Sequence, residues 1–516
     1  MTWQPEIDEL ARRKALAAEL GGEERVARHR AAGKLTVRER IAGFADHGSF
    51  REIGSLSGFA DYDDSGHLDE FTPANFVCGT VLVDGRPAMV GADDFTVRGG
   101  SAEASLHHKL AYSEEYARSL RLPIIRLVDG SGGGGSVATY LDIGRTYVPP
   151  LPGMGDQIAA LAEVPVVAAA LGSVAGLGAA RVAASHFSVM VEGTAQLFVA
   201  GPPIVRYATH EDVPKEDLGG AEVHTANGSV DNPARDETDA FGQLRRFLSY
   251  LPSSVWEVPP VVASDDPVDR REAALLDLIP RERRRGYDPR RLIALVCDQG
   301  SFFEVGPRWG RTVVTGLATL AGYPVGVIAM DPAVWGGALT ADGSDKLRRH
   351  IDLCNTFHLP VVAFVDQPGF AIGTVAEAAG TLRRGVSMIA ALYQASVPFF
   401  SLIVRRAFGV AGGALVDRGR PNHRAAWPSG DWGSLPLEGG VEAAYRRDLE
   451  AADDPEALRA DLLSQFEAVR SPFRTAEPFD IEEIIDPRDT RPMLCEWVGL
   501  AYPTLQPGPK ATGYRP

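Results

Sequence analysis

The sequence predicts an α/β protein built from two similar domains in tandem. The segment LPIIRLVDG at residues 122–130 recurs 237 positions later as LPVVAFVDQ at residues 359–367. An amphipathic helical pattern precedes each copy, and glycines follow it. A unit that occurs twice in one chain predicts two like domains and a site to which both contribute.

The repeat extends well beyond one strand. Residues 79–91 contain two apolar stretches around Asp84-Gly85, a pair that predicts a tight hairpin. Residues 313–328 show the corresponding pattern in the second copy, after a Gly-Ser-Phe triplet that both copies share.

Each half then shows a helix that leads into a buried strand. Apolar residues recur at helical spacing along residues 106–120 and 347–357. Largely apolar stretches follow at residues 123–128 and 360–365. A helix followed by a strand buried on both faces is the pattern of βαβ units in a layered α/β fold. Cys354 falls on the apolar helix face and is expected to be a core residue.

The boundary between the domains is expected near residue 250. The stretch 231–285 contains several prolines and a run of charges, which is typical of an interdomain segment. We therefore expect an N-terminal domain over residues 1–250 and a C-terminal domain over residues 251–516.

Composition and charge narrow the classes of function. The chain has 516 residues, 45% of them hydrophobic and 23% charged, and its net charge is −16. The acidic balance argues against a nucleic-acid partner, which needs a basic surface. There is no signal-peptide pattern, and the longest apolar run, residues 164–180, is short for a membrane span. Four separated cysteines without metal-ligand spacing favour a cytoplasmic protein that holds no metal.

No side chain has the setting of a nucleophile. The chain lacks a Gly-x-Ser-x-Gly elbow, and Ser131 misses that spacing by one residue. It also lacks a Walker A loop and a dinucleotide-binding glycine pattern.

Small residues recur instead where strands run into helices. The five junctions are residues 130–135, 172–180, 336–338, 369–373 and 409–414. Close helix packing explains any one of them, because glycine permits it. Their recurrence in both copies favours exposed backbone N–H groups at helix starts, which could hold the oxyanion of a thioester enolate.

Seven segments match, in order, the pattern of a known family; they are residues 33–41, 94–101, 198–203, 216–221, 364–370, 426–428 and 485–491. Over nearly its whole length the chain resembles the carboxyltransferase (β) subunits of biotin-dependent acyl-CoA carboxylases, of the propionyl-CoA and methylcrotonyl-CoA type. The resemblance implies two tandem crotonase-like (ββα-superhelix, ClpP/crotonase) domains. It also implies a homohexamer whose active sites lie between the N-terminal domain of one subunit and the C-terminal domain of another.

The resemblance implies a reaction without a side-chain catalyst. In the family, carboxybiotin releases CO2, the ureido anion removes a proton from the acyl-CoA, and backbone amides stabilise both anions. The chain has no Met-Lys dipeptide and no ATP-binding loop. Biotin is therefore expected on a separate α-type subunit that combines biotin carboxylase and biotin carboxyl carrier, with a coenzyme A thioester as the substrate.

Carried over by position, the resemblance assigns residues to the site. The first pair of oxyanion donors falls on Gly176 and Leu177, and the second on Val410 and Ala411. The other assigned residues are Gly132, Gly133 and Gly134 on the acyl-CoA side, and Pro368, Gly369 and Phe370 where biotin approaches.

Four positions depart from the family pattern. Leu177 replaces the second glycine of the first site, and Val410 interrupts the glycine pattern of the second. The amide survives both replacements, since only proline removes it, but Val410 is not expected to tolerate the φ angle that glycine allows. Gly412 and Gly413 stand where propionyl-type enzymes have Tyr-Asp. They are expected to enlarge the acyl pocket, which favours a longer, branched or unsaturated acyl group.

Three functions are consistent with these residues. The first is the carboxyltransferase subunit of an acyl-CoA carboxylase. The second is a biotin-independent enzyme of the same fold that decarboxylates or transcarboxylates an acyl-CoA through the same enolate. The third is a non-catalytic scaffold subunit whose activity is lost through Leu177 and Val410.

Overall fold

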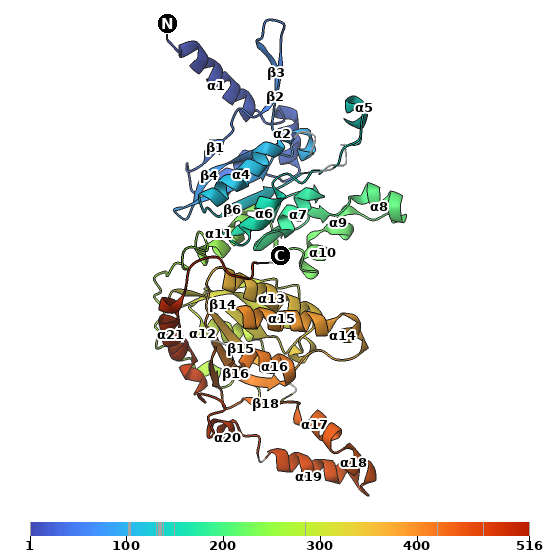
Figure 1. The fold of residues 1–516 in the computed structure, drawn as a ribbon, viewed down its shortest axis with the longest axis vertical. Coiled ribbons are helices and arrows are strands. Elements are labelled where there is room, and N and C mark those ends of the chain that lie inside the picture. Colours follow the sequence, from blue (N-terminus) through green and yellow to red (C-terminus); the bar gives the residue numbers. More distant parts are fainter. Residues whose placement is uncertain are drawn as a thin grey trace. The chain divides into compact units, whose positions relative to one another are not determined.

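The computed structural model divides the chain into two compact units (Figure 1). Unit 1 is Met1–Glu257 together with Gly513–Pro516, and unit 2 is Val258–Thr512. The structure describes residues 2–101, 105–130, 132, 137, 139–148, 150–283, 285–419, 422–467, 469–514 and 516. No helix within these residues is long and apolar enough to span a membrane.

Unit 1 is built on one large mixed sheet with helices around it (Figure 1). Its strands are β1 (Arg51–Ile53), β2 (Gly58–Tyr62), β3 (Leu68–Pro73), β4 (Phe76–Val83), β5 (Arg86–Asp93), β6 (Ile124–Val128), β7 (Val166–Ala170), β8 (Ser173–Ala175), β9 (Phe187–Val191), β10 (Gln196–Phe198) and β11 (Asn232–Ala234). Its helices are α1 (Gln4–Ala18), α2 (Glu23–Ala31), α3 (Val37–Phe44), α4 (His107–Ser119), α5 (Thr139–Ile143), α6 (Met154–Ala160), α7 (Leu177–Ala183), α8 (Pro202–Thr209), α9 (Lys215–Gly219), α10 (Ala221–Ala226) and α11 (Glu237–Ser249), with a 3-10 turn η1 (Arg98–Gly100).

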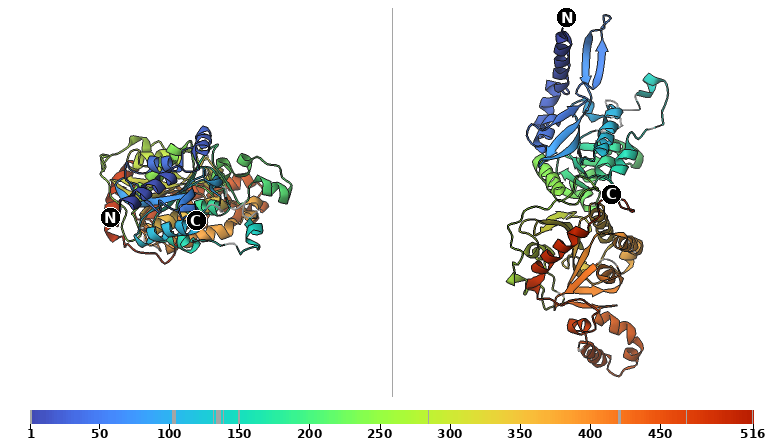
Figure 2. Two further views of the ribbon diagram at one scale, coloured as in Figure 1. Left: turned by 90° about the horizontal axis from the view of Figure 1, so that it is seen from above. Right: turned by 60° about the vertical axis from the view of Figure 1, so that its left-hand side comes forward.

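The sheet order in unit 1 is β1-β4-β5-β6-β7-β9-β11. β4 and β5 form the predicted antiparallel hairpin around Asp84-Gly85, and β5 to β11 run parallel along this order. β8 pairs with β10 outside the large sheet. The β2–β3 hairpin projects beside α1 (Figure 2), and Arg13 of α1 donates a hydrogen bond to the Tyr62 hydroxyl at 3.0 Å.

The first part of the segment expected between the domains instead belongs to unit 1. β11 adds a parallel edge strand beside β9, and α11 buries Phe241, Leu244 and Phe247. The prolines and the charge run that suggested an interdomain segment lie at residues 252–267 and 281–285, and α11 ends before both of them.

Unit 2 repeats the architecture. Its strands are β12 (Phe303–Val305), β13 (Val313–Leu320), β14 (Tyr323–Met330), β15 (Val361–Gln367), β16 (Phe399–Phe408), β17 (Asn422–Ala426) and β18 (Asp431–Gly433). Its helices are α12 (Pro289–Val296), α13 (Ala341–Thr356), α14 (Thr374–Ala378), α15 (Thr381–Gln394), α16 (Gly409–Val416), α17 (Leu437–Ala444), α18 (Arg446–Ala451), α19 (Pro455–Glu467), α20 (Pro472–Ala476) and α21 (Thr490–Ala501), with 3-10 turns η4 (Ala273–Leu275), η5 (Trp335–Gly337), η6 (Pro487–Asp489) and η7 (Tyr502–Thr504).

The two sheets share strand order and register. The sheet of unit 2 runs β12-β13-β14-β15-β16-β17, with β18 also paired to β16. Met89 of β5 pairs with Ile124, and Gly326 of β14 pairs with Val361, which are the positions 237 residues later. The sequence repeat is therefore a structural duplication.

Backbone conformation is duplicated even where the side chains differ. Arg98 has a φ of 48° and Trp335 a φ of 49°, although residues other than glycine rarely adopt positive φ. Asp84 and Ala321, at 51° and 50°, form a second pair at the same separation.

A large apolar cluster of unit 2 includes Leu292, Ile293 and Val296 of α12 and Leu494 and Val498 of α21. Cys354 of α13 is fully buried with Leu347 and Ile351, which confirms it as a core residue. Helices α17, α18 and α19 stand apart from the sheet (Figure 2), and a small cluster of Val441, Leu449 and Leu462 holds them together.

Candidate active site

A cavity of about 110 Å³ lies in unit 1 at the carboxyl ends of parallel strands, where ligands of α/β proteins commonly bind. Asp93 ends β5, and Gly132 follows β6. Leu177 and Gly178 line the same cavity. The structure thus brings together two of the residues assigned from the sequence, Gly132 and Leu177.

A left-handed glycine begins α7. Gly176 has a φ of 62°, and its backbone N–H donates to the carbonyl of Phe198 at 3.1 Å. That N–H is therefore engaged in the β8–β10 pairing. The next two amides, of Leu177 and Gly178, donate to no acceptor within the described residues. The open donors thus lie one position later than the expected pair.

Gly132 lies where the backbone passes close to that of Ala175. A Cβ atom at this position would lie 2.7 Å from the carbonyl oxygen of Ala175, and its φ of 74° disfavours other residues. Gly133, Gly134 and Ser131 lie outside the described residues.

A buried ion pair contacts the C-terminal end of α7. Arg126 of β6 donates to both carboxylate oxygens of Glu114, at 2.9 and 2.6 Å. Its Nη1 also donates to the carbonyls of Arg181 and Ala184 at the end of α7. Burial opposes ionisation of Glu114, but the charge and hydrogen bonds of Arg126 outweigh it and lower the pKa of that carboxyl. Arg126 therefore positions the helix whose first amides face the cavity.

Two charged residues of the cavity wall were missed by the sequence reasoning. Asp93 and Arg181 both line the cavity, with Asp93 Oδ1 3.7 Å from Arg181 Nη1. The available signal was the position of Asp93 at the end of an apolar strand, directly before the matching segment 94–101. Arg181 had no signal, because only the helix packing shows that it faces inward.

Unit 2 repeats the helix start. Gly409 has a φ of 60°, against 62° for Gly176. Val410 has no positive φ, so the conflict expected for a valine with a glycine-like φ does not arise here; the residue with positive φ is Gly409. The side chain of Val410 is 69% exposed, and Ala411 is fully buried. The amides of both donate to no acceptor within the described residues.

Gly412 and Gly413 differ in their surroundings. A Cβ atom on Gly412 would lie 2.7 Å from the carbonyl carbon of Ala407, so this glycine allows α16 to pack on β16 and opens no pocket. A Cβ atom on Gly413 would meet nothing within 4 Å. The prediction that Gly412 enlarges the acyl pocket was therefore wrong, because this glycine faces β16.

The loop Pro368-Gly369-Phe370 is held by backbone and side-chain contacts. Gly369 accepts a hydrogen bond from the Leu339 N–H and donates its own N–H to Gln367 Oε1, both at 2.9 Å. Phe370 packs against Gly385. Gln367 is fully buried, and its Nε2 has no acceptor within the described residues. The Gln367 amide thus fixes the loop through its oxygen, while its buried nitrogen has no hydrogen-bond acceptor among the described residues.

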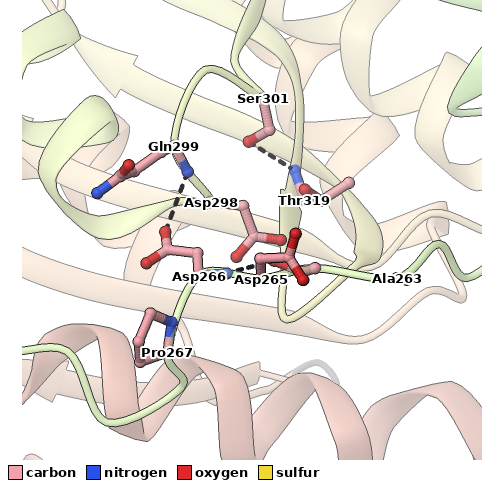
Figure 3. Close-up of a pocket in the computed structure, with 9 residues that line it drawn as sticks. Ala263, Asp265, Asp266, Pro267, Asp298, Gln299, Ser301 and Thr319 are labelled. Atoms are coloured by element: carbon pink, nitrogen blue, oxygen red, sulfur yellow. Dashed lines mark hydrogen bonds between the residues drawn. The ribbon is translucent and has the colours of Figure 1, made fainter.

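A second cavity, of about 380 Å³, lies in unit 2 and has acidic walls (Figure 3). Asp266 accepts from Arg270 and from the Gln299 N–H, and Asp298 accepts from Arg491 and the Gly322 N–H. These two carboxylates are therefore structural. Within the described residues no group of three or more potential metal ligands occurs.

Residues 28–505 match the carboxyl transferase domain, and the chain belongs to this family. It is 34% identical over 501 residues to the carboxyltransferase subunit of propionyl-CoA carboxylase from Haloferax mediterranei, covering 96% of this chain and 95% of that protein. It is 31% identical over 499 residues to the α subunit of methylmalonyl-CoA decarboxylase from Veillonella parvula, again covering 96% and 95%.

A solved structure is similar over the whole chain. Transcarboxylase 12S, described as a hexamer with methylmalonyl-CoA and methylmalonic acid bound, matches with a TM-score of 0.89 and 30% identity, covering 100% of this chain and 98% of that one. The resemblance inferred from the sequence is confirmed, and so is the fold of two tandem crotonase-like domains. The chain is a carboxyltransferase of this family.

Proposed function

We propose that this chain is the carboxyltransferase subunit of a biotin-dependent acyl-CoA carboxylase. One observation carries the proposal: each unit has a left-handed glycine followed by two open amides at a helix start, Leu177 and Gly178 in unit 1 and Val410 and Ala411 in unit 2. Two preorganised donors are what an oxyanion hole requires, and a carboxyl transfer between two enolate-like anions needs two such holes.

Unit 1 is assigned to the acyl-CoA. The amides of Leu177 and Gly178 would hold the thioester oxygen as negative charge develops on it, with Gly132 forming the adjacent wall. A longer, branched or unsaturated acyl group is expected from the resemblance alone, because Gly413, an exposed residue of unit 2, carries no side chain where propionyl-type enzymes have aspartate.

Unit 2 is assigned to biotin. When bound, biotin supplies the carboxyl group to be transferred and a ureido group that takes up a proton. Pro368, Gly369 and Phe370 would form its seat, and the amides of Val410 and Ala411 would stabilise the ureido oxygen. Biotin is expected on an α-type biotin carboxylase and carrier subunit. The homohexamer expected from the resemblance is supported by the hexamer named for transcarboxylase 12S.

Decarboxylation of methylmalonyl-CoA by the purified chain, with and without free biotin, tests the assignment. We expect CO2 release that requires biotin, because biotin accepts the carboxyl group in the reverse of the proposed reaction. Release that is indifferent to biotin would support the biotin-independent enzyme, which the likeness to the Veillonella decarboxylase subunit makes the second candidate. No release under either condition would support the scaffold.

The acyl preference needs a separate assay. With a biotinylated α-type subunit from a propionyl-CoA carboxylase as the carboxyl source, we expect branched or unsaturated acyl-CoAs to be carboxylated faster than acetyl- or propionyl-CoA. The opposite order would contradict the larger acyl group while leaving the carboxyltransferase assignment intact.

A further inference from the structure

The cavity of unit 1 has a largely polar wall. Besides Leu177 and Gly178, six polar side chains line it: Asn75, Asp93, Ser101, Ser105, His107 and Arg181. In the proposed function the acyl group of the thioester enters this cavity of about 110 Å³. A plain hydrocarbon chain would displace water from the polar wall and replace none of its hydrogen bonds, which costs affinity. The wall therefore indicates an acyl group that is itself polar.

Two charged side chains of this wall leave a gap between them. Asp93 Oδ2 accepts a hydrogen bond from the Asp129 N–H at 3.2 Å, which fixes the carboxyl group against the end of β6. Asp93 Oδ1 lies 3.7 Å from Arg181 Nη1, which is too long for a direct hydrogen bond. An oxygen atom at about 2.8 Å from each of these two atoms would bridge the gap.

The two side chains have few other hydrogen-bond partners. Within the described residues no donor reaches Asp93 Oδ1, and Arg181 Nε has no acceptor. Glu114 Oε1 lies 3.6 Å from Arg181 Nη2, again beyond hydrogen-bond distance, and both Glu114 oxygens are bonded to Arg126. The Asp93 side chain is 15% exposed and that of Arg181 4%. A bound group that pairs with them therefore has little competition from bulk water.

The opposite charges restrict the group that fits between them. A carboxylate in the gap would be repelled by Asp93, and an ammonium group by Arg181. Burial raises the pKa of the Asp93 carboxyl, although the charge of Arg181 opposes that effect. A hydroxyl suits either protonation state of Asp93, because a hydroxyl both donates and accepts hydrogen bonds. It can donate to the Asp93 carboxylate and accept from the Arg181 guanidinium.

We propose that Asp93 and Arg181 are specificity-determining residues, which select an acyl-CoA that carries a hydroxyl on its acyl chain. The inference rests on the proposed function, because it takes the thioester to be held at Leu177 and Gly178 in the same cavity. It leaves the α-proton to the ureido group, since neither side chain acts on the α carbon. It adds a polar group to the longer, branched or unsaturated chain expected from the resemblance.

Binding of matched acyl-CoAs tests the selection without biotin or a partner subunit. Dissociation constants are measured by isothermal titration calorimetry with the full-length protein. Hydroxyacetyl-CoA is compared with propionyl-CoA, and γ-hydroxybutyryl-CoA with pentanoyl-CoA, because each pair differs only by a hydroxyl in place of a methyl group. A hydroxyl on the β carbon is avoided, because an enolate would expel it. In the pair whose hydroxyl reaches the gap, we expect the hydroxylated thioester to bind at least about 10-fold more tightly.

Two variants assign the preference to these side chains. Asp93→Val removes the carboxyl oxygens and keeps a side chain of similar size. Arg181→Met removes the guanidinium and leaves the bond between Asp93 and the Asp129 N–H intact, so it serves if Asp93→Val fails to fold. We expect either variant to reduce the preference to about threefold or less, since the hydroxyl loses one partner.

The ratio within a pair separates selection from structure. A purely structural role of Asp93 or Arg181 would weaken both members of a pair equally and leave their ratio unchanged. His108→Gln, at an exposed position on α4 outside the cavity wall, is the matched control and should keep the wild-type ratio.

The binding assay and the decarboxylation assay fail separately. Equal binding within both pairs, or a preference that survives in either variant, would overturn the selection and leave carboxyl transfer standing. A preference that depends on the two side chains, with no CO2 release under either condition, would support a scaffold that binds hydroxylated acyl groups. A chain that binds none of the four thioesters would overturn the selection, and if it also released no CO2, the proposed function as well.

Discussion

Glycines at the strand-to-helix junctions serve two different purposes in this chain. Gly176 and Gly409 adopt a left-handed backbone that turns each chain segment into a helix start. Gly172 and Gly412 instead allow close approach: a Cβ atom would lie 1.9 Å from Asp129 Oδ1 at the first and 2.7 Å from a backbone carbon at the second. Close packing, one of the two interpretations open to the sequence, is therefore confirmed at Gly172 and Gly412, and the role of the other junctions as oxyanion donors stays a prediction.

Leu177 offers a direct test of the amide donors. It is the first residue of α7, where proline is well tolerated because the lost N–H has no partner within the helix. Leu177→Pro should therefore remove one oxyanion donor with little change in melting temperature, and lower kcat for carboxyl transfer by about 100- to 1,000-fold.

Leu177→Ala is the matched control, because it shortens the side chain and keeps the amide. We expect it to retain most of the activity. Equal losses in the two variants would show that the leucine side chain, and not its N–H, is what the reaction needs.

At the scale of elements, a capping box sets the start of α3. Thr36 Oγ1 accepts from the Glu39 N–H, and the Glu39 carboxylate accepts from the Thr36 N–H at 2.8 Å. α3 carries Arg40, which is bonded to the buried Glu237 of α11. The matching segment 33–41 is therefore a helix start that ties two elements of unit 1 together, and its Lys34 and Arg40 also pair with Asp129, directly after β6.

The capping box predicts a pH dependence of stability. Hydrogen bonds from Arg30 and the Thr36 N–H lower the pKa of Glu39 to about 2. A carboxyl whose pKa is lowered on folding stabilises the protein above its unfolded pKa, and that contribution disappears as the pH falls through the folded value. The difference in melting temperature between the wild type and Glu39→Gln should be full at pH 7, narrow below about pH 4.3, and vanish near pH 2.

Glu115→Gln, at an exposed position on α4, is the control. At each pH it should have the same melting temperature as the wild type. A gap between wild type and Glu39→Gln that stays constant down to pH 2 would contradict the role of the carboxylate charge.

At the scale of the whole molecule, the duplication predicts that unit 2 folds by itself. Within the described residues, the large apolar cluster of unit 2 is made by buried residues between Leu275 and Tyr502, among them Phe364, Phe400 and Trp427. Residues 258–512 expressed alone should unfold cooperatively in urea, with one transition that circular dichroism and tryptophan fluorescence both report. A gradual loss of signal, or transitions that do not coincide, would show that unit 2 needs the rest of the chain.

Much of the fold was accessible from the sequence because its signals are local. The hairpin at Asp84-Gly85 and the strand at 124–128 follow from turn chemistry and apolar runs that involve neighbouring residues. The amphipathic helix α11 was included in the predicted interdomain segment because prolines and a charge run follow it at residues 252–285. The conflict expected at Val410 does not arise, because the residue that adopts the positive φ at this helix start is Gly409.

The sequence by itself determined the family, the duplicated α/β fold and the junctions where the reaction is expected, since these depend on local patterns and on ordered motifs. Only the tertiary structure decided which amides are open. The Gly176 N–H is engaged because β10, some twenty residues away, supplies the Phe198 carbonyl. Only the tertiary structure placed Asp93 and Arg181 in one wall with Leu177, because that neighbourhood forms where β5, β6 and α7 converge. Hydrogen-bond partners and cavity walls come from segments distant in the chain, and no local pattern records them.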